Sequence, residues 1–132
     1  MRPDSRKVLS TALEVELDEQ DLARCRAVLS DRLEHVRSQC EALRAAIDAM
    51  RNARSLTTAD DEHDPEGSTV SLDQARDSAL LAQAERSFSE LSAARQRLAE
   101  GTYGRCERCG RDIPTARLIA RPEARHCVSC SR

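Results

Sequence analysis

The fold of this chain is decided by residues 19–54, EQDLARCRAVLSDRLEHVRSQCEALRAAIDAMRNAR, which contain neither Pro nor Gly. Apolar side chains recur through the stretch at steps of three or four residues, the spacing of a coiled-coil seam. They are Leu22, Cys25, Leu29, Leu33, Val36, Cys40, Leu43, Ile47 and Met50. Asp18 stands where an N-cap is expected, and Glu19 and Asp21 suit the first turn. The pattern predicts one long amphipathic helix.

A second helix is predicted from Ser71 onward. Ser71 and Gln74 have the spacing of a capping box, and Gly101 stands in the usual position after a helix end. The apolar residues of this segment also fall at helical spacing: Leu81, Ala84, Phe88, Leu91, Ala94 and Leu98. Two stripes this narrow bury each other and little else, so we expect an antiparallel hairpin.

The link between the two helices is strongly acidic. Residues 55–70 read SLTTADDEHDPEGSTV, with five acids in the seven positions 60–66. A solvated turn is the plain interpretation, although loops of this length are uncommon unless they are functional or disordered. A calcium loop is a third interpretation, since Glu62, Asp64, Glu66, Gly67 and Asp73 fall near EF-hand spacing. His63, among the acids, is interpreted as an incidental loop residue rather than a pH sensor.

The composition limits what the chain can build and do. It has 132 residues, of which 2% are aromatic and 33% are charged. A thick core and a deep pocket are therefore not expected, and no nucleophile–base pair is recognisable, so we expect no enzyme. No apolar run is long enough for a membrane span or signal peptide, which favours a cytoplasmic protein without a membrane partner.

Charge is divided unevenly along the chain. Residues 1–100 carry 14 basic and 20 acidic side chains, whereas residues 101–132 carry seven Arg against three acids. The net charge of residues 101–132 is thus +4, and four thiolates on one Zn²⁺ would lower it to about +2. A long acidic body with a faintly basic end matches a protein partner better than a DNA duplex. No sequence-specific DNA binding is expected.

Four of the six cysteines form two C-x₂-C pairs, Cys106/Cys109 and Cys127/Cys130. Each pair offers two thiolates on one turn, and the segment between them is long enough to fold back, as in a four-cysteine zinc site. Four protein ligands leave no open position, so one structural Zn²⁺ is predicted. His126 is interpreted as a bystander. Cys25 and Cys40, on the apolar stripe, are interpreted as small hydrophobes, with redox sensing as the alternative.

These observations predict an all-α fold: a long antiparallel coiled-coil hairpin with a small C-terminal four-cysteine zinc finger. The expected organisation is an N-terminal arm at 1–17, a hairpin at 18–100 with its acidic tip at 55–70, and a finger at 101–132.

The finger motif extends beyond its cysteines. Its other positions are Gly101-Thr-Tyr103-Gly104 at the entry, then Glu107, Ile113, and Arg117-Leu118-x-Ala120-Arg121-Pro122. With these gaps the segment resembles the DksA/TraR zinc-finger family of bacterial transcription regulators, and the hairpin resembles that family more loosely.

The resemblance implies a non-enzymatic partner of bacterial RNA polymerase whose hairpin enters the secondary channel, probing toward the active site to modulate initiation. The family tip pattern Asp-x-x-Asp-x-Ala carries over to Asp61 and Asp64, with Glu66 where the family has Ala. The resemblance also makes Arg117 and Arg121 candidate contacts for polymerase or for the alarmone ppGpp. Alarmone-binding members have Lys after the last cysteine, where this chain has Ser131, and their basic hairpin position is Glu90 here.

Two other functions remain open on the sequence. A nucleic-acid-binding zinc finger would use a basic face drawn from the finger's arginines, namely Arg105, Arg108, Arg111, Arg117, Arg121 and Arg125. A coiled-coil adaptor would keep its activity after the charges of Asp61 and Asp64 are removed. A monomer is expected for a hairpin that enters a pore.

Overall fold

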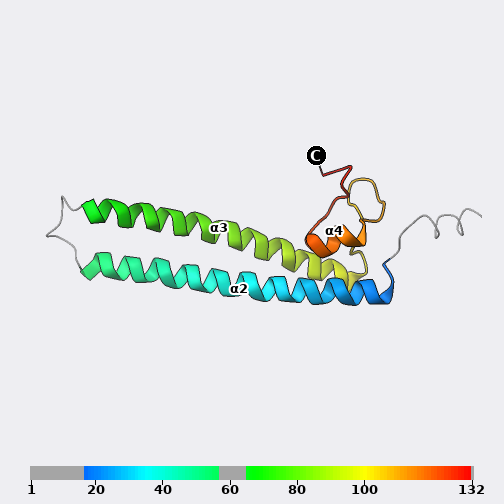
Figure 1. The fold of residues 1–132 in the computed structure, drawn as a ribbon, viewed down its shortest axis with the longest axis horizontal. Coiled ribbons are helices and arrows are strands. Elements are labelled where there is room, and N and C mark those ends of the chain that lie inside the picture. The colour runs from blue at the N-terminus through cyan, green and yellow to red at the C-terminus, as the bar shows by residue number, and fades with distance from the viewer. Residues whose placement is uncertain (1–16, 57–64, 132) are drawn as a thin grey trace, which may run out of the picture. The chain divides into compact units, whose positions relative to one another are not determined.

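The computed structural model describes residues 17–56 and 65–131, with only the backbone described at 65–68 and 70. It contains helix α2 (Glu19–Leu56), helix α3 (Pro65–Glu100) and the short helix α4 (Thr115–Ala120). Helices α2 and α3 run antiparallel (Figure 1). The described residues form no strand, only an isolated bridge between Arg105 and Asp112. The predicted all-α hairpin with a C-terminal finger is confirmed.

Helix α2 begins where the sequence predicts. The Asp21 backbone N–H donates to Asp18 Oδ1 at 2.7 Å, and the Leu22 N–H donates to the Asp18 carbonyl at 2.9 Å. A side-chain oxygen thereby satisfies a backbone donor that has no partner inside the helix. Asp18 is the N-cap of α2.

The predicted seam forms the core of the hairpin. The chain divides into two compact units, a base unit that combines residues up to Arg32 with Glu90–Arg132, and a second unit, Leu33–Ser89. Each contains a segment of α2 and a segment of α3, packed through their apolar stripes. The buried seam residues are Cys25, Leu29, Leu33, Val36, Cys40 and Ile47 of α2, and Ala84, Leu91 and Ala94 of α3.

The start of α3 differs from the prediction. The helix begins at Pro65, so Ser71 lies inside it and the predicted capping box with Gln74 is wrong. Proline suits a first helical position because its ring presets the backbone angle and its missing N–H would have no partner there. Gln74 instead accepts a hydrogen bond from Arg54 Nη1 at 3.1 Å, which joins the two helices.

The helical bounds also revise the link. Helix α2 extends through Leu56 and α3 occupies positions from Pro65 onward, so residues 55–56 and 65–70 of the predicted 16-residue link are helical. Gly67 and Asp73 therefore lie within α3, which does not fit an EF-hand loop. Asp61, His63 and Asp64 lie outside the described residues, as do the Glu66 side chain and the arm up to residue 16.

Helix α3 ends in a Schellman motif. Gly101 has φ of +81°, the Thr102 N–H donates to the Arg97 carbonyl at 2.9 Å, and the Gly101 N–H points to the Leu98 carbonyl at 3.4 Å. This confirms the predicted role of Gly101, since a residue without Cβ adopts the left-handed conformation freely. The motif turns the chain into the finger.

Among the described helices, none combines the length and apolar character that crossing a lipid bilayer requires.

Candidate zinc centre

The first cysteine pair sits on a tight turn that we call knuckle 1, residues 106–109. The Gly110 N–H donates to the Cys106 carbonyl at 2.9 Å, and the Cys106 N–H donates to the Arg111 carbonyl at 2.8 Å. Gly110 has φ of +75°, a conformation that side chains with Cβ rarely adopt. The turn brings the two sulfur atoms within 4.8 Å of each other.

Knuckle 2, residues 127–130, supplies the second pair. The Cys130 N–H donates to the Cys127 carbonyl at 3.0 Å, which closes the turn. Knuckle 2 is tied to knuckle 1 by the Glu107 N–H, which donates to the Arg125 carbonyl at 2.9 Å, and by Arg108, whose Nη1 donates to the Cys130 carbonyl at 3.3 Å. These contacts fold the second pair onto the first.

The four sulfur atoms of Cys106, Cys109, Cys127 and Cys130 all lie within 4.8 Å of one another. The Cys109 and Cys127 sulfurs are 3.7 Å apart. Four thiolates around one Zn²⁺ at about 2.3 Å place their sulfurs about 3.8 Å apart, so the donor set fits zinc in both softness and spacing. Cys106 is buried, Cys109 is exposed, and the other two are half-buried.

The pKa values of the clustered thiols differ widely, and this bears on metal binding. Burial acts to raise the pKa of the Cys106 thiol, but backbone N–H groups from both knuckles point at the sulfur and bring its pKa down to about 6. The hydrogen bond to Cys127, and then burial, raise the pKa of Cys130 to about 12. Four clustered thiols therefore cannot all ionise at neutral pH on their own. A divalent metal supplies the missing positive charge and displaces the protons.

The finger has a small apolar core below the metal site. Ile113, Leu118 and Pro122 are fully buried, and Tyr103 is 9% exposed. Helix α4 carries Leu118 inward from the segment that joins the knuckles. So few apolar groups cannot stabilise a segment of this length alone, which makes the metal part of the fold.

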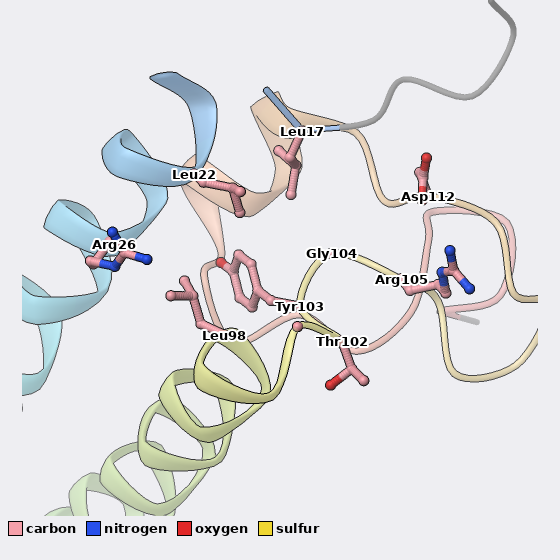
Figure 2. Close-up of a pocket in the computed structure, with 10 residues that line it drawn as sticks. Leu17, Leu22, Arg26, Leu98, Thr102, Tyr103, Gly104, Arg105 and Asp112 are labelled. Atoms are coloured by element: carbon pink, nitrogen blue, oxygen red, sulfur yellow. The ribbon is translucent and has the colours of Figure 1, made fainter. Parts of the chain in front are cut away.

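The entry to the finger packs against the base of the hairpin. Figure 2 shows the Tyr103 ring among the side chains of Leu22 of α2 and Leu98 of α3. Leu17 lies over Gly104, and its Cδ1 is 2.6 Å from the position that a Cβ at Gly104 would occupy. These residues border a hollow of about 270 Å³ together with Arg26, Arg105 and Asp112.

The other residues singled out in the finger have separate positions. Arg117 is half-buried, and its Nε donates to the His126 carbonyl at 3.0 Å, so it braces the approach to knuckle 2. Arg121 of the finger and Glu90 of α3 expose their side chains. His126 is not among the clustered metal-ligating side chains of the described residues.

Sequence reasoning missed the contacts that hold the finger to the hairpin. Arg32 and Arg97, one from each long helix, donate to finger carbonyls, and Tyr103 donates to a third. Every residue has a backbone carbonyl, so the residue type does not show which carbonyl accepts a hydrogen bond. A search for paired charges therefore cannot find these contacts. The one available signal is Tyr103, a lone tyrosine next to the motif.

The finger matches a known family of zinc fingers. Residues 101–132 match the family model described as the prokaryotic dksA/traR C4-type zinc finger. The chain is similar to an uncharacterized protein of Aquifex aeolicus (strain VF5), 48% identical over 42 residues, which are 32% of this chain and 29% of that protein. It is also similar to general stress protein 16O of Bacillus subtilis (strain 168), 34% identical over 73 residues, 55% of this chain and 45% of that protein. The matches thus span less than half of either relative.

A solved structure extends the likeness from the finger to the fold. The transcription factor DksA2 from Pseudomonas aeruginosa superposes with a TM-score of 0.74 at 20% sequence identity, over 94% of this chain and 90% of that one. At this identity the likeness shows a shared fold. The family match and the shared fold confirm the resemblance predicted from the sequence, and the clustered cysteines with the C4-type match establish one structural zinc as the cofactor.

Proposed function

We propose, on the premise that residues 101–132 are a C4-type zinc finger of the prokaryotic dksA/traR family, that this protein is a transcription regulator. Its partner is bacterial RNA polymerase, which it meets as a monomer in the cytoplasm. The observation that carries the proposal is this finger on a hairpin with the fold of a transcription factor. Four thiolates fill the coordination sphere of zinc, so the metal organises the finger and takes no part in catalysis.

The proposed mode of action uses the hairpin as a probe. Helices of 38 and 36 residues form its two arms, and the secondary channel of the polymerase receives the end at which they are linked. There Asp61, Asp64 and Glu66 approach the catalytic region and change the lifetime of the open promoter complex. The acidic charge of the tip suits a partner surface that is basic or holds metal ions.

Two finger arginines have different parts in this proposal. Arg121 has an exposed side chain and is the candidate contact for polymerase or for an alarmone. Arg117 is bound to the His126 carbonyl, so its contribution is to hold knuckle 2 in place. With Glu90 and Ser131 in place of basic residues, we propose that regulation by this protein does not require an alarmone.

Internal contacts weaken the nucleic-acid alternative. Arg125 pairs with Glu107 at 3.7 Å, and Arg108 and Arg117 donate to finger carbonyls. Half of the six arginines that could form a basic face are thus engaged within the finger. If the zinc-loaded chain nevertheless binds duplex DNA with a steep salt dependence, the nucleic-acid function replaces the proposal.

The test compares the wild-type chain with Asp61→Asn/Asp64→Asn and with a matched control, Asp31→Asn/Asp48→Asn. The control removes two exposed carboxylates from the surface of α2. Binding to core RNA polymerase and open-complex lifetime are measured for all three proteins. We expect equal binding, with the effect on lifetime lost only in the tip variant.

Two outcomes oppose the proposal in different ways. Absence of binding by the wild-type chain removes the polymerase as its partner. Binding with an unchanged effect in the tip variant points to the coiled-coil adaptor, whose activity does not depend on Asp61 and Asp64.

A further inference from the structure

Three side chains of the base unit donate to one short run of finger carbonyls, residues 120–123, which we call the docking segment. One donor comes from α2, one from α3 and one from the entry to the finger. The pairs are Arg32 Nη2 with the Ala120 carbonyl at 3.2 Å, Arg97 Nη2 with the Glu123 carbonyl at 3.4 Å, and Tyr103 Oη with the Pro122 carbonyl at 2.9 Å. Both long helices therefore hold the same piece of the finger.

The docking segment is linked to both knuckles of the zinc site, through the chain and through hydrogen bonds. It leads directly into the stretch before knuckle 2, where the Arg125 carbonyl accepts from the Glu107 N–H of knuckle 1 at 2.9 Å. Its partner Tyr103 lies just ahead of Cys106 in the sequence. Any rearrangement of the knuckles therefore displaces either the docking segment or the residue that holds it.

Tyr103 and Arg97 are at least partly removed from water, which makes their hydrogen bonds costly to lose, whereas Arg32 is exposed. Tyr103 is 9% exposed and Pro122 is fully buried. Burial, and then the nearby Arg125, lower the pKa of the Arg97 guanidinium, which stays charged and needs an acceptor. A buried donor without a partner destabilises a fold more than a satisfied one stabilises it. Departure of the docking segment would leave the Tyr103 hydroxyl and the Arg97 guanidinium without these acceptors.

Tyr103, which donates to the docking segment, also contacts a cysteine of α2. Cys25 is 0% exposed, and its thiol interacts with the Tyr103 hydroxyl. Leu22 and Leu98 lie beside the same ring (Figure 2). Cys25 is thus covered by the entry to the finger through Tyr103 as well as by the seam of the hairpin. Cys40 is 4% exposed and belongs to the second unit, which contains no finger residue.

We propose that the docking segment couples the zinc site to the base of the hairpin, so that loss of the metal releases the finger from α2 and α3 and uncovers Cys25. The metal then controls how the finger is attached as well as whether the finger is folded. The coupling requires no partner protein, and it stands whether or not the protein binds polymerase.

The first test measures alkylation of Cys25 and Cys40 by iodoacetamide in the full chain, read by mass spectrometry of the separated peptides. The zinc-loaded protein is compared with protein treated with a zinc chelator under reducing conditions. We expect chelation to accelerate alkylation of Cys25 by about ten-fold or more, the scale of a local opening, and to leave Cys40 unchanged. Equal acceleration at both cysteines, or none at Cys25, overturns the proposal.

The second test reads the coupling in the opposite direction, because linkage is reciprocal. Arg97→Gln and Tyr103→Phe each remove one hydrogen bond to the docking segment and leave the four cysteines intact. Arg44→Gln is the matched control, since Arg44 also lies on a long helix and pairs with Glu85 of the second unit at 3.5 Å. Zinc affinity is measured by competition with a chromogenic chelator.

We expect each docking variant to bind zinc about five-fold more weakly than the control, the factor that one hydrogen bond supplies. Each should also alkylate faster at Cys25 while zinc-loaded. Zinc affinities equal to that of Arg44→Gln, with Cys25 still protected, overturn the coupling. Because Tyr103→Phe keeps the ring in its packing site, a general failure to fold is separable from loss of the hydrogen bond.

Discussion

At the residue scale, the attachment of the finger depends on one position without a side chain. Gly104 has φ of +87°, and a Cβ there would lie 2.6 Å from Leu17 Cδ1 and 3.4 Å from Leu118 Cδ1. Two constraints meet at this glycine, a left-handed backbone and a close apolar approach. Gly101 has only the first of them, with φ of +81° and nothing within 4 Å of a Cβ.

The comparison of these glycines gives a prediction. Gly104→Ala should destabilise the base unit by about 1–3 kcal/mol through backbone strain, with a further loss from displacement of Leu17. Gly101→Ala should cost the backbone strain alone, about 1–3 kcal/mol. Thermal unfolding of the zinc-loaded proteins measures both, and equal effects of the two substitutions would show that the contact with Leu17 does not matter.

Tyr103 gives a second residue-scale prediction, which concerns pH. Burial, and then the adjacent Cys25, raise the pKa of Tyr103 well above its ordinary value of 10.0. The folded protein therefore retains the phenolic proton more strongly than the unfolded chain does. The stability that this supplies is fully present below pH 10, and it is lost as the pH rises through the unfolded pKa toward the folded one.

The measurement is a phenolate absorbance titration, which reports a single site because the chain has one Tyr and no Trp. Zinc-loaded protein should show no phenolate at the ordinary pKa of tyrosine and should ionise only with alkaline unfolding. Urea-unfolded protein should titrate normally. A normal titration of the native protein would mean that Tyr103 is exposed to water.

At the element scale, the long seam could be predicted and the start of α3 could not. The seam depends on apolar periodicity, which is visible in the sequence of α2 alone. The start of α3 involves Pro65 and Gly67, which as residue types indicate a turn, whereas proline at a first helical position begins a helix equally well. The contacts of Arg32 and Arg97 were not predictable, since their acceptors are backbone carbonyls.

The N-cap of α2 provides a prediction at this scale. Asp18→Ala removes the acceptor of the Asp21 N–H and should reduce the free energy of unfolding by about 1 kcal/mol. Asp31→Ala is the control, because Asp31 lies away from the ends of the same helix and its side chain is exposed. Chemical denaturation followed by circular dichroism compares them. No difference between the two variants would remove Asp18 as a stabilising cap.

At the scale of the whole molecule, metal and hairpin supply different parts of the stability. In each unit the segments of α2 and α3 bury apolar side chains against each other. The finger has few buried apolar residues and one helix of six residues, so its fold depends on zinc. The four cysteines and their spacing were sufficient to predict the metal site. The docking of the finger on the hairpin required the three-dimensional contacts.

Metal removal should therefore have a local effect on secondary structure. A chelator should abolish the ordered finger and leave most of the helical circular dichroism signal, because α2 and α3 do not contain the ligands. Mildly acidic pH should also release zinc, because protons compete with the metal for the thiolates. Loss of the entire helical signal on chelation would contradict this division between finger and hairpin.

We propose that the linked end of the hairpin enters the secondary channel of RNA polymerase, and site-specific photo-crosslinking tests this. A photoreactive residue is placed at His63, with a second version at Arg86 on the surface of α3 as control. We expect the crosslink from position 63 to map to polymerase peptides that line the channel near the catalytic centre, and the crosslink from position 86 to map elsewhere. Crosslinks from position 63 to DNA alone, or to the exterior of the polymerase, would contradict it.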